Sequence, residues 1–197
     1  MPKIVDHDSQ RQRVAEAAIR IIRRDGIEQA TVRNIAAEAG LSVGSMRHYF
    51  SSQLELFSFA MHLFLDRIVE RIQRMSFEGP PLDSLVLLLL QFIPLDEERR
   101  LEMDVWLAFM AKATVHEELK PLSDKLHSGL YDSAHYVVQA LLSEGLAHPG
   151  LDVEFESQRL HALVDGLALQ HMLQPDTLPP ERIRELLTRH LRGLERE

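Results

Sequence analysis

The stretch AAEAGLSVGSMRHYF, residues 36–50, decides the fold of the N-terminal part of this chain. Apolar residues up to Ala39 precede Gly40 at helical spacing, and Ser42 follows the glycine as a suitable N-cap for a new helix. The pattern predicts a helix, a tight turn and a second, short helix that ends in two aromatic residues.

This arrangement fits a helix-turn-helix. Such a motif needs a turn residue that tolerates positive φ, a small residue where the helices cross and one apolar anchor on the second helix. Gly40, Ala36 and Met46 are placed for these three roles. The residues left to face outward are Val43, Gly44, Ser45, Arg47 and His48. They can enter a major groove of DNA, where Arg47 can donate two hydrogen bonds to O6 and N7 of guanine. On spacing alone, the alternative is an ordinary helical corner.

Composition limits the class of protein. The chain has 197 residues, of which 45 % are hydrophobic and 26 % charged, so it can bury a substantial core. The absence of cysteine excludes disulfides and thiol chemistry. No apolar leader follows Met1, and the most apolar run, residues 85–93, is shorter than a membrane span requires. We expect a cytoplasmic protein without a membrane partner.

The charge is unevenly distributed. The net charge is −8, yet residues 1–50 contain 8 Lys and Arg against 6 Asp and Glu, whereas the rest contains 14 against 24. DNA binding depends on the local field rather than on the total charge. The asymmetry therefore gives modest support to a DNA-binding N-terminal module on an acidic body.

The chain reads as all-α. Helices are expected from Val14 to a stop at Gly26, after a Thr31 N-cap, after Gly40, and from Ser52 toward Met75. A break at FEGPPLD, residues 77–83, precedes five more helices, near 81–93, 96–114, 117–146, 153–174 and 180–194. Pro121 and Gly129 predict a kink or a split in the third of these five. We expect a DNA-binding domain over 1–51 and a ligand-binding and dimerisation domain over 52–197.

Longer stretches resemble a known family. TVRNIAAEAGLSVGSMRHYFSSQLELF, residues 31–57, resembles the DNA-binding motif of TetR-type transcriptional repressors, and RVAEAAIRIIRRDGIEQA, residues 13–30, resembles their first helix. WLAFMAKA, residues 106–113, and LHALVDGLALQHML, residues 160–173, are similar to the BetI-type branch. The resemblance implies an all-helical homodimer whose first three helices bind DNA and whose other helices form a ligand pocket and the dimer interface.

The resemblance also assigns DNA contacts. Thr31, Arg33 and Tyr49 match positions at which the family contacts the DNA backbone. Gln53 stands where the family usually has a phosphate-binding lysine, and Arg47 where it often has a tyrosine. Arg47 is therefore the best candidate for a base contact peculiar to this protein. The expected DNA-binding residues are Thr31, Arg33, Ser42, Val43, Gly44, Ser45, Arg47, His48, Tyr49 and Gln53.

The ligand side is less specific. The expected pocket residues are Phe92, Trp106, Phe109, Met110, Leu130, Tyr131, Asp165 and Met172. A stripe of aromatic residues and methionines at helical spacing is more often plain core than a ligand pocket. Trp106 and Asp165 could hold a cation together with Glu102 and Asp104, although we expect the last two to be solvated. The expected inducer is a small, largely apolar molecule.

Catalysis and metal binding are not expected. VHEEL, residues 115–119, lacks the His-Glu-x-x-His spacing, and no Gly-x-Ser-x-Gly elbow or phosphate-binding glycine loop occurs. His161 and His171 are separated by a helical rise of about 15 Å, so one ion cannot bind both. We expect no enzyme, no catalytic residue, no cofactor and no metal.

The predicted function is a ligand-responsive regulator, most simply a repressor released from a palindromic operator. The alternative is a helical adaptor that no longer binds DNA.

The last two expected helices carry apolar stripes. Paired across a two-fold axis they would form a four-helix bundle, which predicts a homodimer. The expected interface residues are Leu163, Gly166, Leu167, Ile183, Leu187 and Leu191. The alternative is that the stripes pack within their own subunit.

Overall fold

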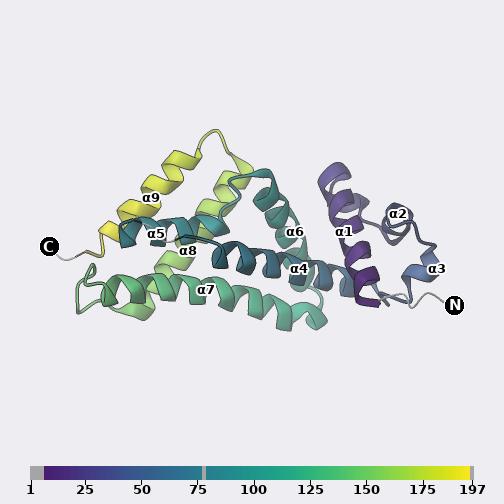
Figure 1. The fold of residues 1–197 in the computed structure, drawn as a ribbon, viewed down its shortest axis with the longest axis horizontal. Helices are drawn as coiled ribbons and strands as arrows, with labels where there is room; N and C mark the ends of the chain where they lie inside the picture. The colour runs from purple at the N-terminus through teal and green to yellow at the C-terminus, as the bar shows by residue number, and fades with distance from the viewer. Residues whose placement is uncertain (1–6, 77–78, 196–197) are drawn as a thin grey trace. The chain divides into compact units, whose positions relative to one another are not determined.

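The computed structural model describes residues 7–76 and 79–195, and this part of the chain is all-α as predicted. Its helices are α1 (His7–Asp25), α2 (Val32–Glu38), α3 (Val43–Met46), α4 (Gln53–Gln73), α5 (Pro81–Leu89), α6 (Glu97–Ala113), α7 (Lys120–Ser143), α8 (Val153–Leu173) and α9 (Pro180–Arg192) (Figure 1). Short 3-10 turns occupy Ile27–Gln29, Leu90–Phe92 and Glu117–Leu119. Among these helices, none combines the length and apolar character that a membrane crossing requires.

Two predicted elements differ from the structure. The helix after Gly40 is shorter than expected, because α3 covers only Val43–Met46 and the next residues form a hydrogen-bonded turn. A split at Pro121 or Gly129, one of the two outcomes predicted there, is absent, since α7 is continuous from Lys120 to Ser143. Pro121 lies in its first turn, where a missing N–H costs no helical hydrogen bond. In the predicted break at 77–83, residues 77 and 78 lie outside the described residues.

The chain forms two compact units. The first joins the chain up to Arg67 with Leu101–Leu122, and the second joins Ile68–Arg100 with the chain from Ser123 onward. The unit boundaries fall inside α4, α6 and α7. The domain boundary predicted between residues 51 and 52 therefore lies inside the first unit, because the start of α4 packs there by contacts that composition does not reveal.

The core of the first unit follows the predicted helical periodicity. Fully or nearly fully buried residues include Val14, Ala17, Ala18, Ile21, Ile35, Ala36, Met46, Phe50, Leu56 and Phe57. Thr31 Oγ1 accepts the Asn34 N–H at 3.2 Å and caps α2. Gly40 has φ +70°, a left-handed conformation that glycine adopts without strain. It ends α2 and lets the chain turn into α3, so the predicted helix-turn-helix geometry is present.

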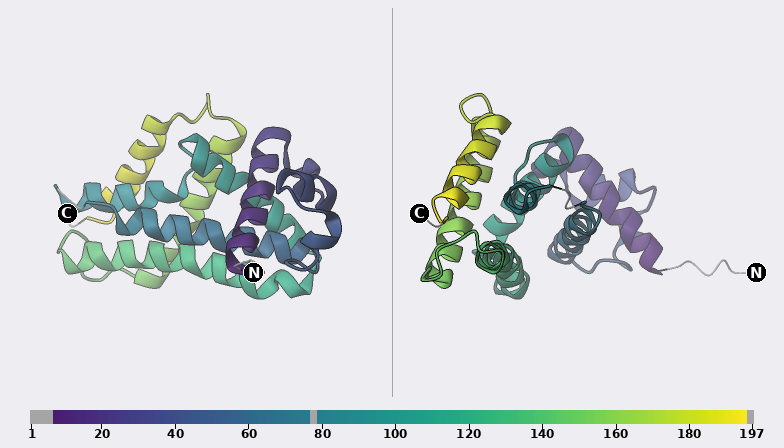
Figure 2. Two further views of the ribbon diagram at one scale, coloured as in Figure 1. Left: turned by 45° about the vertical axis from the view of Figure 1, so that its right-hand side comes forward. Right: turned by 60° about the vertical axis from the view of Figure 1, so that its left-hand side comes forward.

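In the second unit α9 packs against α5 (Figure 2). Ile183, Leu187 and Leu191 are 0 % exposed within the single chain. These three residues were assigned to the dimer interface, and that assignment is wrong, because side chains with no accessible surface cannot contact a second copy. Leu167, which is 4 % exposed, also belongs to the core. The stripe of α9 is satisfied within its own subunit.

One face of α8 carries apolar residues that lie at the surface of the single chain. It carries Phe155 at 56 %, Leu169 at 41 % and Leu173 at 68 % exposure. Exposed Ala162 and half-buried Gly166 lie between them at helical spacing. We call these five residues the outer stripe of α8. Figure 1 shows the chain reversing direction between α8 and α9.

Candidate nucleic-acid interface

Residues 42–50, which we call the α3 segment, are held by one side-chain cap and two buried anchors. Ser42 Oγ accepts the Ser45 N–H at 3.0 Å and lies 2.9 Å from the Ser45 hydroxyl. Met46 and Phe50 are each 2 % exposed and turn inward. The Phe50 N–H donates to the Met46 carbonyl at 3.0 Å, so the helical turn continues beyond α3. The segment is therefore fixed on its inner side while its outer side stays open.

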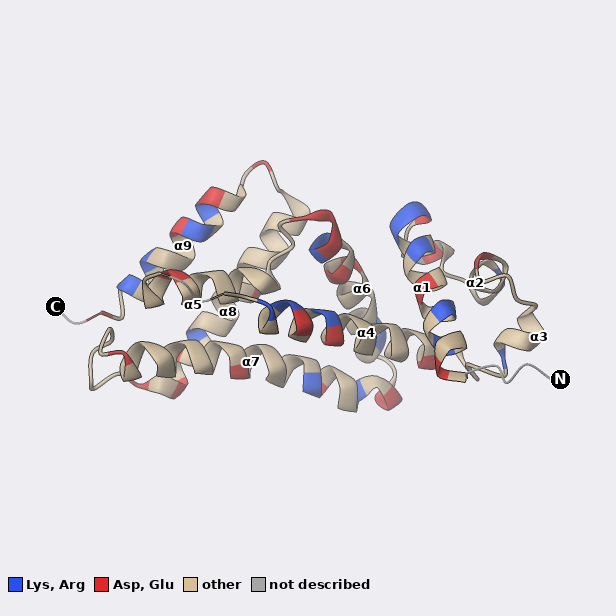
Figure 3. Cartoon of the chain, viewed as in Figure 1, with Lys and Arg blue, Asp and Glu red and all other residues tan. Residues whose placement is uncertain are grey.

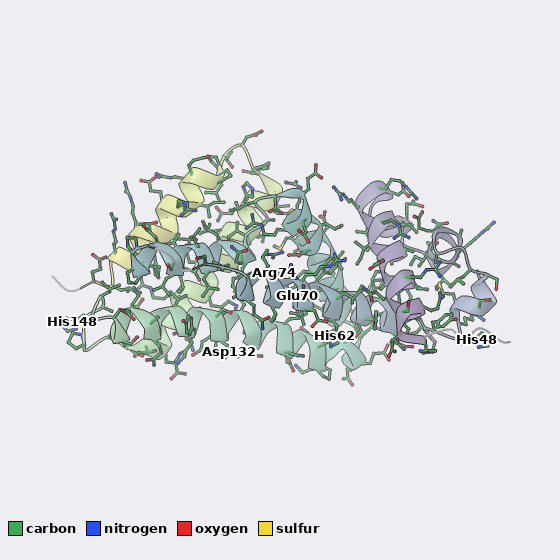
Figure 4. The ribbon with its side chains drawn as sticks, in the orientation of Figure 1. His48, His62, Glu70, Arg74, Asp132 and His148 are labelled. Carbon is green, nitrogen blue, oxygen red and sulfur yellow. The ribbon has the colours of Figure 1, made fainter. Side chains whose placement is uncertain are left out.

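The outer side carries the predicted base-reading groups. Val43 is 38 % exposed, and Gly44, Arg47 and His48 are exposed (Figure 4 labels His48). Among the described residues, the Arg47 guanidinium has no ion-pair or hydrogen-bond partner, so its donors are available to an external acceptor. The chain between Glu38 and Glu55 contains no carboxylate, as the colouring of α3 in Figure 3 illustrates. Such a surface can donate to base edges and phosphates without local repulsion.

Two further predicted contacts lie at the start of α2. Thr31 and Arg33 are exposed. The Thr31 oxygen is engaged as the N-cap, although its hydroxyl can still donate a hydrogen bond. No partner of the Arg33 side chain lies within residues 7–76 and 79–195. Both residues are thus exposed, and each keeps a donor for an external acceptor.

Gln53 has an internal partner that the sequence did not indicate. Its Nε2 donates to the Ala30 carbonyl at 2.8 Å, and the residue is half-buried. This bond ties the first turn of α4 to the residue that precedes the Thr31 cap. One amide hydrogen is therefore committed inside the protein, which leaves a weaker and uncharged donor for DNA.

Arg11 and Glu55 hold the end of the α3 segment between α1 and α4. The Arg11 guanidinium lies 4.6 Å from the Phe50 ring centroid and 4.9 Å from that of Phe59, and its Nη1 is 3.0 Å from Glu55 Oε1. The Ser51 N–H donates to the Glu55 carboxylate at 2.8 Å. This backbone bond, with smaller contributions from the Ser51 hydroxyl and Arg11, lowers the pKa of Glu55. Sequence reasoning missed this cluster because no local spacing signals a pair 44 residues apart.

The predicted pocket residues divide between the two units. Trp106, Phe109 and Met110 belong to the first, and Phe92, Leu130, Tyr131, Asp165 and Met172 belong to the second. Phe109 is 1 % exposed and serves as core of the first unit. The expectation that Glu102 is solvated is wrong, since it is 7 % exposed, whereas Asp104 is exposed.

A polar cluster links α7 and α8. The rings of His127 and His161 have centroids 4.7 Å apart, and His161 Nε2 lies 3.4 Å from Asp165 Oδ2. The Tyr131 ring is 6.3 Å from His161. Burial lowers the pKa of His161 and raises that of Asp165, so each group is biased toward its neutral form. The i,i+4 spacing of His161 and Asp165 was the available signal for this pair.

Known proteins share both halves of the chain. Residues 14–58 match the family described as "Bacterial regulatory proteins, tetR family", and residues 81–195 match "BetI-type transcriptional repressor, C-terminal". The HTH-type transcriptional regulator PksA of Bacillus subtilis (strain 168) is 39 % identical over 195 residues, which cover 98 % of this chain and 94 % of that protein.

Solved structures agree with this relationship. A transcriptional regulator from Rhodococcus sp. Rha1 is 30 % identical with a TM-score of 0.78, over 93 % of this chain and 95 % of the other. A regulator from Saccharomonospora viridis, solved in complex with choline, shares the fold at 23 % identity and a TM-score of 0.81, over 96 % and 99 % of the two chains. The family is not enzymatic. The chain is a helix-turn-helix transcriptional regulator of the TetR family with a BetI-type C-terminal domain.

Proposed function

We propose that the protein is a cytoplasmic, homodimeric repressor that binds a palindromic operator and is released by a small molecule. The observation that carries this proposal is the open outer side of the α3 segment. There Arg47 is exposed and has no partner among the described residues, while Met46 and Phe50 hold the segment from the inside. Arg47 donates to a guanine, and Thr31, Arg33 and Tyr49 contact phosphates.

A single α3 segment contacts few base pairs, so the proposal requires a dimer. Two segments held about 34–36 Å apart would read successive major grooves of a palindrome. We assign the dimer contact to the outer stripe of α8, with Leu163 at its edge. Exposed apolar side chains next to Ala162 and Gly166 permit close approach of a second helix.

The proposed inducer is small and largely apolar, and it binds the BetI-type domain. The similar choline-bound regulator supports small-molecule binding in this part of the fold. An inducer must bind more tightly to the conformation that does not fit DNA, because equal affinity for both states shifts nothing. Helix α4 begins beside the α3 segment in the first unit and ends in the second, so it is the element we expect to move.

The experiment compares Arg47→Ala with Arg33→Ala on duplexes that the wild-type protein selects from a random-sequence pool. Arg47→Ala should weaken binding by about 1–3 kcal/mol and relax the preference at one base pair per half-site. Arg33→Ala, the matched control, should weaken binding on every sequence alike. A uniform loss for Arg47→Ala would make it a phosphate contact. No salt-sensitive complex even at low salt would favour the helical adaptor.

A further inference from the structure

His7 joins the start of α1 to the end of the α3 segment. Its Nε2 lies 3.4 Å from the carbonyl oxygen of His48, and its ring centroid is 5.2 Å from that of Tyr49. His7 is exposed. No local sequence pattern indicates these contacts, because the partners of His7 lie 41 and 42 residues further along the chain.

The contact with the His48 carbonyl determines which ring nitrogen of His7 carries the hydrogen in the neutral imidazole. A carbonyl oxygen only accepts, so Nε2 must carry the hydrogen in this arrangement. The other nitrogen, Nδ1, then carries no hydrogen in the neutral imidazole. Neutral His7 offers an acceptor at Nδ1, whereas protonated His7 offers a second donor and a positive charge.

Among the described residues, His48 and Tyr49 of the α3 segment contact His7. On α1 the neighbouring charged residues are Asp8 and Arg11. Arg11 is engaged with Glu55. Within the described part of the chain, the His48 carbonyl is the sole hydrogen-bond partner of the His7 side chain. The imidazole therefore remains available to an external anion.

We infer that protonated His7 binds a backbone phosphate of DNA beside Tyr49, so that DNA affinity is higher when the imidazole is charged than when it is neutral. The inference rests on the proposed function, in which the α3 segment lies on DNA and Tyr49 contacts its backbone. A phosphate accepts from Nδ1–H and is repelled by the lone pair of neutral Nδ1. The contact is independent of base sequence, because phosphates are the same at every position.

The experiment measures dissociation constants of the full-length protein at about pH 6 and pH 8, on a duplex selected by the wild type and on one of unrelated sequence. Wild type should bind about tenfold more weakly at the higher pH on each duplex, since two phosphate contacts are lost per dimer. The slope of log affinity against log salt should be steeper at the lower pH by about 1.8. A change in fold stability alone would not alter that slope.

Three variants locate the effect. His7→Gln should remove most of the pH dependence, and His7→Lys, which stays charged, should bind equally at both pH values and match wild type at the lower one. His62→Gln, the matched control at an exposed histidine of α4 outside the α3 segment, should keep the wild-type pH dependence. An unchanged pH dependence in His7→Gln, or its loss in His62→Gln, would overturn the inference. Failure to bind any duplex at either pH would instead refute the proposed function.

Discussion

A leucine in the outer stripe of α8 and a leucine in the buried stripe of α9 should respond differently to substitution, the first in dimer association and the second in folding stability. Leu169 is 41 % exposed, whereas Leu187 is 0 % exposed in the single chain. Complete burial of a leucine side chain is worth about 1.5–3 kcal/mol. Covering the exposed fraction of Leu169 in both copies therefore contributes about 1–2.5 kcal/mol to a dimer. Replacing Leu169 with a carboxylate would remove this favourable free energy of burial and add the cost of desolvating a charge.

We predict that Leu169→Glu weakens the free energy of dimer association by about 2–4 kcal/mol, which raises the dissociation constant roughly 30- to 700-fold. The free energy of unfolding of the monomer should change little, because the Leu169 side chain lies at the surface. Leu187→Ala should instead lower the free energy of unfolding and leave dimer association unchanged. Truncating a fully buried leucine costs about 2–5 kcal/mol of folding free energy, while the outer stripe stays intact.

Sedimentation velocity over a concentration series and urea unfolding separate the two effects. Leu169→Glu should sediment as a monomer and lose operator affinity with a nearly unchanged urea midpoint. Leu187→Ala should unfold at lower urea and remain dimeric when folded. A Leu169→Glu protein that sediments and binds DNA like wild type would refute the assignment of the outer stripe, and a monomeric wild type would refute the dimer.

Two further predictions concern the first unit. Because the Ser51 backbone N–H, the Ser51 hydroxyl and Arg11 hold the pKa of Glu55 below its ordinary value, their stabilisation is present at neutral pH and is lost as the pH falls through that lowered pKa. Glu55→Gln should therefore cost roughly 1 kcal/mol or less at neutral pH and progressively less as acid protonates Glu55, measured by urea unfolding, and a cost that does not change with pH would contradict this. Gly40→Ala, at φ +70°, should lose about 1–2 kcal/mol of stability, whereas Gly44→Ala, whose new Cβ would lie 3.8 Å from Ser42 Oγ, should stay as stable as wild type and lose DNA affinity. Equal stability of the two alanine variants would refute the role of Gly40.

Local signals predicted most of the fold. The caps at Thr31 and Ser42 and the turn at Gly40 each depend on residues within three or four positions, so the printed sequence contains the whole interaction. The bounds of α8 and α9 followed from helical periodicity with an error of one or two residues.

Periodicity does not reveal what covers an apolar stripe. Ile183, Leu187 and Leu191 have the spacing of a buried face whether the partner is α5 or a second subunit. The same limit applies to contacts made across the fold. Gln53, which the resemblance places among the DNA contacts, also donates to the Ala30 carbonyl, 23 residues away, and no local pattern indicates that bond. Glu102 was expected in solvent because carboxylates are seldom buried, and packing of α6 overrides that preference.

The placement of ion pairs explains how a protein with a net charge of −8 can approach DNA. The α3 segment has no carboxylate, and the acidic residues that flank it are Glu38 and Glu55. Arg20 and Arg24 lie 3.0 and 3.1 Å from the Glu38 carboxylate and lower its pKa, and Arg11 pairs with Glu55. Both flanking charges are thus compensated within the first unit. The acidic excess lies outside residues 1–50, which contain 8 Lys and Arg against 6 Asp and Glu. Salt weakens the repulsion between a phosphate and any exposed charge more than about 10 Å from it.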